Sequence, residues 1–328
     1  MTFAAPAEIR SVASVGLGTV GASWAALMLA KGIDVRGFDT DDDAETRARS
    51  LIESAWPSLR QLGATALQSP PFEKLTMFGT VEEAVETADL VQDNTPEVLD
   101  TKQEVFERID SAAAPSVIVL SSTGGIMPSK LQGFCRNPGR LVVFHPFNPA
   151  HIVPLVEVVP GKQTAPEVVE WAMDFARYLG KKPICLRAEI VGHMTNRLQF
   201  ALVREAVRCI VENVASPKDV DAAVRYGLAP RWMLMGGLQT LHLAGGYGGM
   251  KAILDHAGPA IENWWNPGGE IRLTEEVKCA LVKASADLSE DSEISEWMAW
   301  RDAELVPLLG AQAIADEKQP HKKGNRGV

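Results

Sequence analysis

The chain has 328 residues, enough for two domains of ordinary size, and 46% of them are apolar against 23% charged. This composition is typical of a folded protein with a sizeable core. The net charge of −10 excludes a dominant basic face, so nucleic acid is not an expected partner. No apolar run reaches the roughly 18 residues that a bilayer requires, so no membrane association is expected, and we expect no signal peptide. Four scattered cysteines without a CxxC pair favour a cytoplasmic, reduced setting.

Residues 11–40 predict the opening of an α/β fold. A short β-type run from Val12 to Val15 meets a glycine-rich turn, a helical stretch and a second strand over Asp34–Phe38. Further strands are expected within residues 88–94, 116–122 and 140–145, and helices within residues 100–113 and 165–180. This alternation predicts a Rossmann-type, doubly wound, mostly parallel sheet with helices on both faces.

The turn after the first strand, VGLGTVG, has the GxGxxG pattern of a dinucleotide-binding loop. Its glycines permit a tight turn, a close approach to pyrophosphate and tight packing of helix on sheet. Asp39 ends the second strand, where a carboxylate can bind the adenosine ribose and repel a 2′-phosphate. The pattern predicts NAD as the cofactor; the alternative is a strand–helix turn without a ligand. The expected cofactor-binding residues here are Gly16, Leu17, Gly18, Thr19, Val20, Gly21 and Asp39.

The stretch LVVFHPFNPAHIVPLVEVV, residues 141–159, places a histidine and a glutamate within apolar runs. Glu157 is costly to bury unless something pairs with it, and His145 is the obvious partner. If Glu157 accepts from one ring nitrogen, the other can take the hydroxyl proton during hydride transfer. A purely structural pair is the alternative. The remaining histidines show no metal-ligand spacing, so no metal is expected and we treat them as structural or surface residues: His151, His193, His242, His256 and His321.

The pattern changes from about Asn196, where apolar residues recur at three- and four-residue spacing and strand patterns cease. We place a boundary near residue 189, between an NAD-binding domain (1–189) and an all-helical C-terminal domain (190–328) for substrate binding and dimerisation. The final polar stretch, residues 315–328, lacks periodicity and is expected to be a mobile tail.

Three motifs resemble the L-3-hydroxyacyl-CoA dehydrogenase superfamily. Residues 145–159, HPFNPAHIVPLVEVV, are similar to its HxFNP and LVEV signature; GHMTNRLQFALVREA (192–206) resembles its GFIxNRL helix, and TPEVLDTKQEVF (95–106) its VENLxxK stretch. The similarity runs from about residue 10 to residue 260. It implies that His145 is the catalytic base, that Glu157 is its partner and that Asn196 positions the substrate oxygen. It also implies NAD contacts from Glu97, Lys102 and Asn148, the last near the nicotinamide.

One loop departs from the family pattern. The family's SNTSS reads SSTGG here, and the serine that hydrogen-bonds near the reacting hydroxyl falls on Gly124. Ser122 and Thr123 are the nearest candidates to supply that contact. Two interpretations stay open: a lost hydrogen bond that weakens transition-state stabilisation by a few kcal/mol, or a substrate that needs more room.

The substrate is expected to be a small acid. CoA-using members carry a lysine-rich helical hairpin after the second strand, whereas residues 41–75 hold three arginines and one lysine against six acidic residues. Residues 225–259 resemble the non-CoA branch, which contains L-carnitine and L-gulonate 3-dehydrogenases. Arg231 is a candidate clamp for a substrate carboxylate, with an interface or surface ion pair as the alternative. Trp232, with Trp264 and Trp265, is a candidate for a trimethylammonium box or for core and dimer contacts.

We therefore predict an NAD-dependent, homodimeric dehydrogenase that oxidises a carnitine- or gulonate-like L-3-hydroxy acid, with His145 as general base. One alternative is an L-3-hydroxyacyl-CoA dehydrogenase. The other is a non-catalytic, crystallin-like protein that binds NAD.

Overall fold

The computed structural model describes residues 3–265, 272–289 and 293–319, and the chain divides into two compact units, residues 1–198 and 199–328. Each unit is treated by itself below. The division at residue 198 lies inside the long helix α7 (Met194–Val211). A functional boundary near residue 189 stays a prediction.

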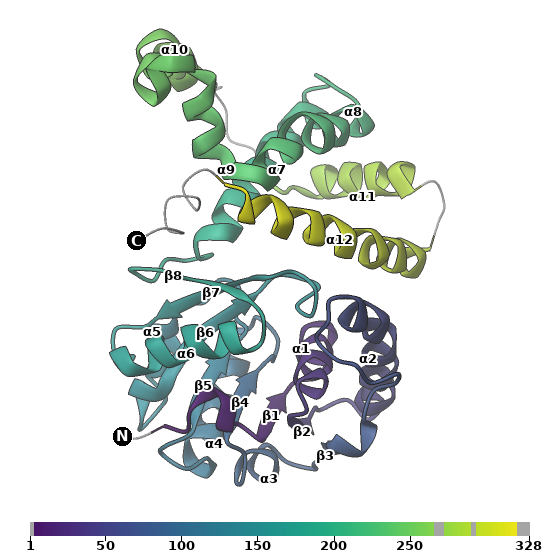
Figure 1. Cartoon of the computed structure of the whole chain (residues 1–328), viewed down its shortest axis with the longest axis vertical. Coiled ribbons are helices and arrows are strands. Elements are labelled where there is room, and N and C mark those ends of the chain that lie inside the picture. Colours follow the sequence, from purple (N-terminus) through teal and green to yellow (C-terminus); the bar gives the residue numbers. More distant parts are fainter. Residues whose placement is uncertain (1–2, 266–271, 290–292, 320–328) are drawn as a thin grey trace. The chain divides into compact units, whose positions relative to one another are not determined.

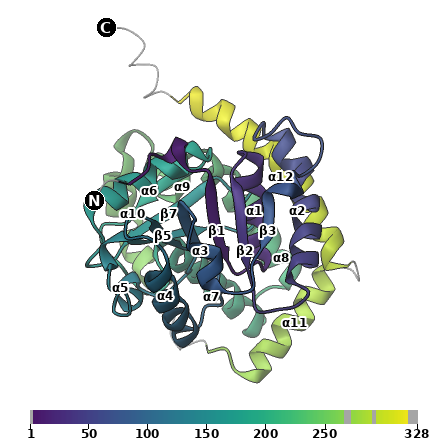
Figure 2. The same ribbon diagram turned by 90° about the horizontal axis from the view of Figure 1, so that it is seen from below.

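The first unit is built on one eight-stranded sheet with the order β3-β2-β1-β4-β5-β6-β7-β8 (Figure 1). Every neighbouring pair is parallel except β6 and β7, which are antiparallel. Figure 2 shows β1, β2 and β3 side by side in this sheet. The predicted doubly wound, mostly parallel sheet is confirmed. Its strands are β1 (Ser11–Val15), β2 (Asp34–Phe38), β3 (Leu75–Met77), β4 (Leu90–Asp93), β5 (Ile118–Ser121), β6 (Leu141–Pro146), β7 (Leu155–Pro160) and β8 (Lys182–Cys185).

Helices cover both faces of the sheet. Neighbouring residues of a strand point to opposite faces, so they pack under different helices. Leu90 belongs to the core cluster under α1 (Thr19–Ala30), α2 (Ala44–Gln61) and α6 (Pro166–Tyr178). The next residue, Val91, belongs to the cluster under α3 (Val81–Val85), α4 (Leu99–Ala112) and α5 (Pro128–Gln132). The strands are therefore buried on both faces, as a parallel sheet requires.

The second unit is helical, as predicted, over the residues that the structure describes. In its described part the buried residues are Val207, Arg208, Gly249 and Val306, so this unit encloses little core of its own. Besides the end of α7 it contains α8 (Pro217–Ala222), α9 (Ala229–Ala244), α10 (Gly249–Trp265), α11 (Glu275–Ser289) and α12 (Ile294–Glu317).

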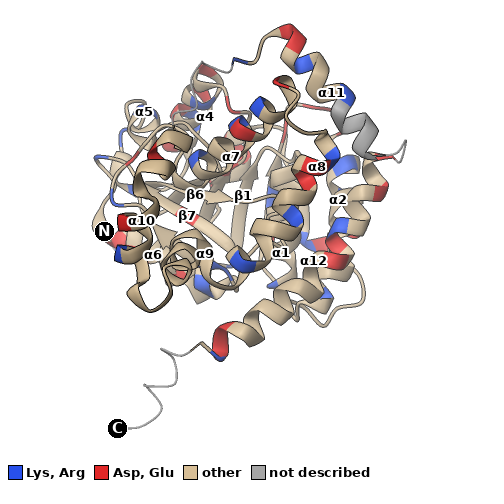
Figure 3. Ribbon diagram, turned by 90° about the horizontal axis from the view of Figure 1, so that it is seen from above, with Lys and Arg blue, Asp and Glu red and all other residues tan. Residues whose placement is uncertain are grey.

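The C-terminal prediction is revised in one respect. The expected tail began at residue 315, but α12 continues to Glu317; residues 320–328, with His321, lie outside the described residues. Figure 3 shows acidic and basic residues interspersed along α2, α11 and α12. Among the described helices, none combines the length and apolar character needed to cross a bilayer.

Candidate active site

The glycine loop between β1 and α1 is shaped by contacts that exclude side chains at two positions. Gly16 has φ of +91°, and a Cβ there would lie 2.8 Å from the Asn94 carbonyl oxygen. A Cβ on Gly21 would lie 2.0 Å from the Gly16 carbonyl oxygen. Gly18 differs, because a Cβ there would meet nothing within 4 Å. The first and third glycines are therefore required by packing, whereas the second leaves open space.

That open space lies at the start of α1 and fits a dinucleotide. Gly18 is the N-cap of α1, and no side chain caps the helix, so the amides of Thr19 and Val20 begin an uncapped first turn. Such a turn binds a pyrophosphate through its N–H groups and the helix dipole. The Leu17 amide donates to Asp39 Oδ2 at 2.7 Å, which joins the loop to the end of β2. The half-buried carboxylate keeps acceptor capacity for ribose hydroxyls.

The side chain of Lys102 is buried and binds other groups of the protein. Its ammonium donates to Asp93 Oδ2 at 2.7 Å and to the Thr95 carbonyl at 3.1 Å. The side chains of Lys102 and Asp93 are 1% and 0% exposed, and Ser121 Oγ also donates to Asp93 at 2.6 Å. A direct contact with NAD would require this buried ion pair to open. The geometry therefore favours a structural role for Lys102, which holds Asp93 at the end of β4.

Glu97 binds the loop after β5, residues 123–126, called here the clamped loop. Glu97 Oε1 accepts from the Thr123 hydroxyl at 2.6 Å, from the Gly125 amide at 2.9 Å and from the Ile126 amide at 3.1 Å. These bonds occupy Oε1 of the carboxylate that the resemblance assigns to the NAD ribose, whereas, among the described residues, Oε2 accepts only from the Gly124 amide, at 3.4 Å. Glu97 itself remains exposed, so the ribose contact stays a prediction.

The carbonyls of residues 123–125 are bound from the opposite side. They accept, in chain order, from His193 Nε2 at 3.1 Å, from Asn196 Nδ2 at 2.8 Å and from the Gly192 amide at 3.1 Å. The N–H groups and the carbonyls of the clamped loop are thus both satisfied by fixed partners. The loop is therefore held by its backbone.

His145 and Glu157 form the expected pair because β6 and β7 are antiparallel. The register places them opposite each other, so both side chains lie on the same face of the sheet. His145 Nδ1 lies 2.9 Å from Glu157 Oε2, and Glu157 Oε1 accepts from the Thr195 amide at 2.8 Å and its hydroxyl at 2.9 Å. Burial by itself would raise the pKa of Glu157, but the hydrogen bonds from His145 and Thr195 outweigh it and lower the pKa. The ionised carboxylate keeps the proton of a neutral imidazole on Nδ1, which leaves the Nε2 lone pair available.

Gly124 faces this lone pair. A Cβ on Gly124 would lie 3.2 Å from Asn196 Nδ2 and 3.3 Å from His145 Nε2, so three predicted site residues converge. Thr123 gives its hydroxyl to Glu97, as described above. The Ser122 hydroxyl donates to Asn94 at 2.7 Å and accepts from Gln92 and Trp24. These contacts weigh against either hydroxyl replacing the family serine.

Three other residues were expected to contact the cofactor or the substrate. Asn148 is exposed in the connection between β6 and β7. Arg231 and Trp232 belong to the second unit; the Arg231 guanidinium donates to the Gly227 carbonyl at 3.0 Å, and Trp232 is 39% exposed. Their substrate contacts remain predictions.

His193 and Thr195 were missed as members of the site. The ring of His193 is fully buried and its centroid lies 5.5 Å from that of His145. Burial, and then the neighbouring His145, lower the pKa of His193, so it is a neutral donor to the Thr123 carbonyl. The sequence feature that could have revealed His193 is its place in GHMTNR, where the family's GFIxNR has phenylalanine.

Comparison with family models matches nearly all of the first unit and part of the second. Residues 11–190 match the model of the 3-hydroxyacyl-CoA dehydrogenase NAD-binding domain. Residues 192–264 match the 3-hydroxyacyl-CoA dehydrogenase C-terminal domain. The resemblance drawn from the motifs is confirmed.

Similar proteins extend over most of the chain. An L-carnitine dehydrogenase of Streptomyces coelicolor is 40% identical over 306 residues, which are 93% of this chain and 96% of the relative. One from Pseudomonas aeruginosa is 38% identical over 314 residues, covering 96% and 97%. The solved structure of 5-formyl-3-hydroxy-2-methylpyridine 4-carboxylic acid 5-dehydrogenase, an NAD⁺-dependent dismutase, has a TM-score of 0.74 at 28% identity and covers 93% of this chain and 99% of that one. For 3-hydroxybutyryl-CoA dehydrogenase of Escherichia coli, the TM-score is 0.61 at 29% identity, covering 75% and 52%.

The three glycines allow a matched prediction. Gly18→Ala should fold like the wild type but bind NADH at least about tenfold more weakly, because its Cβ enters the space in which the backbone approaches the pyrophosphate. Gly21→Ala should instead lower the stability of the fold by roughly 1–3 kcal/mol, because its Cβ overlaps the Gly16 carbonyl. Thermal unfolding and NADH fluorescence titration measure the two effects. Unchanged NADH affinity in Gly18→Ala would contradict the assignment of the loop.

Proposed function

Because the chain belongs to the 3-hydroxyacyl-CoA dehydrogenase family and is an NAD-dependent oxidoreductase, we propose that it oxidises the hydroxyl of a small L-3-hydroxy acid, with L-carnitine or a close analogue as substrate. The pair His145–Glu157 in front of the clamped loop is the observation that carries this proposal. The relatives named L-carnitine dehydrogenase, at 36–41% identity, support the substrate.

The residues of this chain supply the proton chemistry. Glu157 holds the Nδ1–H of His145, so Nε2 accepts the hydroxyl proton of the substrate. The amide of Asn196 donates toward the same oxygen. NAD, held at the glycine loop of residues 16–21, would supply the acceptor for the hydride of the carbinol carbon, while His145 keeps the hydroxyl proton as an imidazolium. The ionised Glu157 stabilises that imidazolium.

The segment after β2 supports a small acid over an acyl-CoA. Between β2 and β3 the chain forms α2 and a three-residue 3₁₀ turn, Phe72–Lys74, rather than a helical hairpin. The stretch after α2 returns along the helix, where Trp56 Nε1 donates to the Leu67 carbonyl at 3.0 Å. Acidic residues outnumber basic ones over residues 41–75. A multiply charged CoA phosphate therefore finds little to bind in this segment.

A cytoplasmic location belongs to the same proposal. All four cysteines are free thiols, at Cys135, Cys185, Cys209 and Cys279. Free thiols are typical of proteins in a reducing compartment. NAD-linked metabolism of a small acid suits that setting.

A substrate screen tests the proposed function. NAD reduction should be fastest with L-carnitine among L-carnitine, L-gulonate, L-3-hydroxybutyrate and L-3-hydroxybutyryl-CoA, because the charge and shape of the α2 segment disfavour CoA. Faster reaction with the CoA ester would establish the acyl-CoA alternative, and L-gulonate as the best substrate would move the assignment within the non-CoA branch.

The base itself is tested by substitution. His145→Ala should lower kcat by roughly 10²–10⁴-fold, the range for loss of a general base, while the Kd for NADH stays within about twofold. His256, an exposed histidine of α10, provides the control, and His256→Ala should keep wild-type kinetics. Near-normal turnover in His145→Ala would reject the assigned role.

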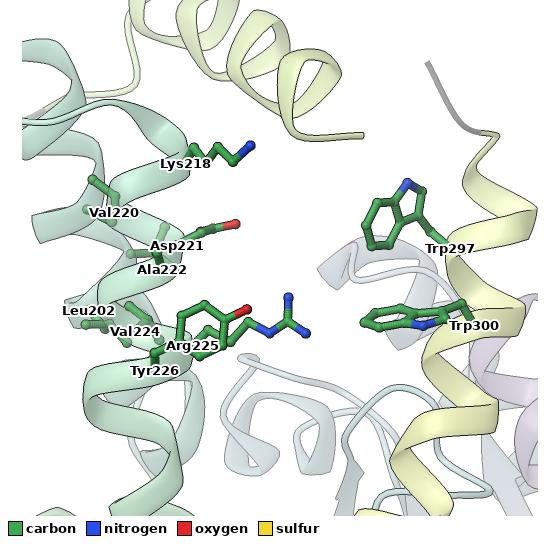
Figure 4. A pocket seen from close by; sticks show the side chains of 12 residues that line it. Leu202, Lys218, Val220, Asp221, Ala222, Val224, Arg225, Tyr226, Trp297 and Trp300 are labelled. Carbon is green, nitrogen blue, oxygen red and sulfur yellow. The ribbon is translucent and has the colours of Figure 1, made fainter. Parts of the chain in front are cut away.

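We infer further that the second unit pairs with a second copy of this chain. Its helices leave large apolar side chains uncovered: Leu238 is 79% exposed, Ile294 78% and Trp265 69%. Large apolar side chains exposed on a unit that encloses little core of its own favour an interface with another chain. Figure 4 shows Trp297 and Trp300 of α12 facing α8 and the π-helical segment Ala223–Leu228 across an open cavity of about 780 Å³. A partner's apolar side chains would fill such a space.

Light scattering tests the pairing. The wild-type protein at micromolar concentration should have twice the chain mass of 35.5 kDa. Leu238→Glu with Ile294→Glu should shift it toward the monomer, because charges would be buried without partners. Leu62→Glu, on a 39%-exposed residue of the first unit, serves as the control and should stay dimeric. A monomeric wild type would contradict the inference.

A further inference from the structure

We propose that Gly124 is a specificity-determining residue, because the side chain it lacks leaves room, called here the socket, for the reacting carbinol group of the substrate to approach Asn196 Nδ2 and His145 Nε2. This inference rests on the proposed function. It decides between the two interpretations of the glycine, a lost catalytic serine or a pocket with more room, in favour of the second.

The socket is defined by two nitrogens of opposite hydrogen-bonding character. Around the position of a Cβ on Gly124, the three nearest heavy atoms are Asn196 Nδ2 at 3.2 Å, His145 Nε2 at 3.3 Å and His145 Cδ2 at 3.8 Å. One amide hydrogen of Asn196 goes to the Gly124 carbonyl, and the second remains for another acceptor. His145 Nε2 offers a lone pair, because Nδ1–H is given to Glu157.

One donor and one acceptor converging on one space match a hydroxyl group. The carbinol oxygen accepts from Asn196, and its hydrogen goes to His145 Nε2, the atom that must remove it. A carbon atom at this place would satisfy neither nitrogen. A Cβ on Gly124 would contact both nitrogens and so narrow the room in which the carbinol group of a substrate can reach them.

The backbone of the clamped loop keeps the socket open. A pair of glycines can otherwise adopt many backbone conformations, and fixing one of them costs conformational entropy. Here the amides of the loop are bound to Glu97, and its carbonyls are bound to the segment 192–196. The loop cannot collapse into the empty position without breaking several of these hydrogen bonds.

The neighbouring hydroxyls do not refill the position. Ser122 bonds to Asn94, Gln92 and Trp24, and Thr123 bonds to Glu97. A substrate bound here can come closer to the loop than it could if residue 124 had a side chain. We expect the site to select secondary alcohols whose carbinol carbon lies against the clamped loop.

The two interpretations give opposite results when a side chain is restored. If Gly124 is a socket, Gly124→Ala and Gly124→Ser should both lower kcat/KM for L-carnitine by roughly 10- to 100-fold, because a displacement of about 1 Å at the reacting group costs that much. The loss should fall mainly on kcat, because the oxygen is displaced from its base, while NADH affinity stays within about twofold. If Gly124 is a lost serine, Gly124→Ser should raise kcat/KM.

Gly125→Ala is the matched control in the same loop. Its Cβ would meet only ordinary contacts, the Gly192 Cα at 3.5 Å and Glu97 Oε1 at 3.6 Å, so most of the activity should remain. Circular dichroism and thermal unfolding confirm that each variant folds; if Gly124→Ala does not, Gly124→Ser carries the comparison.

Three results would overturn the socket: higher activity in Gly124→Ser, unchanged activity in Gly124→Ala, or an equal loss in Gly125→Ala. A wild-type protein inactive on L-carnitine, L-gulonate and L-3-hydroxybutyrate rejects the proposed function itself, and the inference with it. Activity in the wild type together with unchanged variants rejects the inference alone.

Discussion

The site depends on one constraint: a carboxylate buried at 0% exposure inside a strand must be fully paired. Removing one partner from such a buried pair costs roughly 3–5 kcal/mol. Glu157 meets the requirement with the ring of His145 on one oxygen and the amide and hydroxyl of Thr195 on the other. The same bonds that make its burial possible also orient the imidazole and anchor the start of α7. The hydrogen bonds that stabilise the fold at Glu157 therefore also orient the catalytic base.

The sheet brings the rest of the site to the same edge. Strands β1, β4, β5 and β6 are neighbours and run parallel, so their carboxyl ends lie together. Backbone hydrogen bonds continue the sheet beyond those ends, from the Asn94 amide to Val15 and from the Ser122 amide to Asp93. The buried pair Asp93–Lys102 lies directly behind this edge and fixes its polar groups. The cofactor loop, the clamped loop and His145 are thereby placed on one frame.

Features carried by short stretches of sequence were predictable, and those carried by contacts between distant residues were not. The second strand over Asp34–Phe38 and the glycine loop follow from local patterns. The antiparallel pairing of β7 does not, because an apolar run shows no direction; yet it sets the register that joins His145 to Glu157. The ion pair of Lys102 likewise depends on the position of Asp93 at the end of β4. A family motif names Lys102 but does not show that its ammonium is already bound to another side chain of the protein.

The clamped loop shows how a chain can lose a side chain from a site and keep its geometry. A glycine in place of serine removes a hydroxyl and adds backbone freedom, which costs about 0.5–1 kcal/mol relative to alanine. Glu97 on one side and the segment 192–196 on the other offset that cost with hydrogen bonds that go mostly to the backbone of the loop. Asn196 takes part in both tasks, since its amide holds the Gly124 carbonyl and faces the reacting space. The shape of the site is therefore set by main-chain atoms and by the groups that bind them, so the room beside Asn196 and His145 stays open without loosening the loop around it.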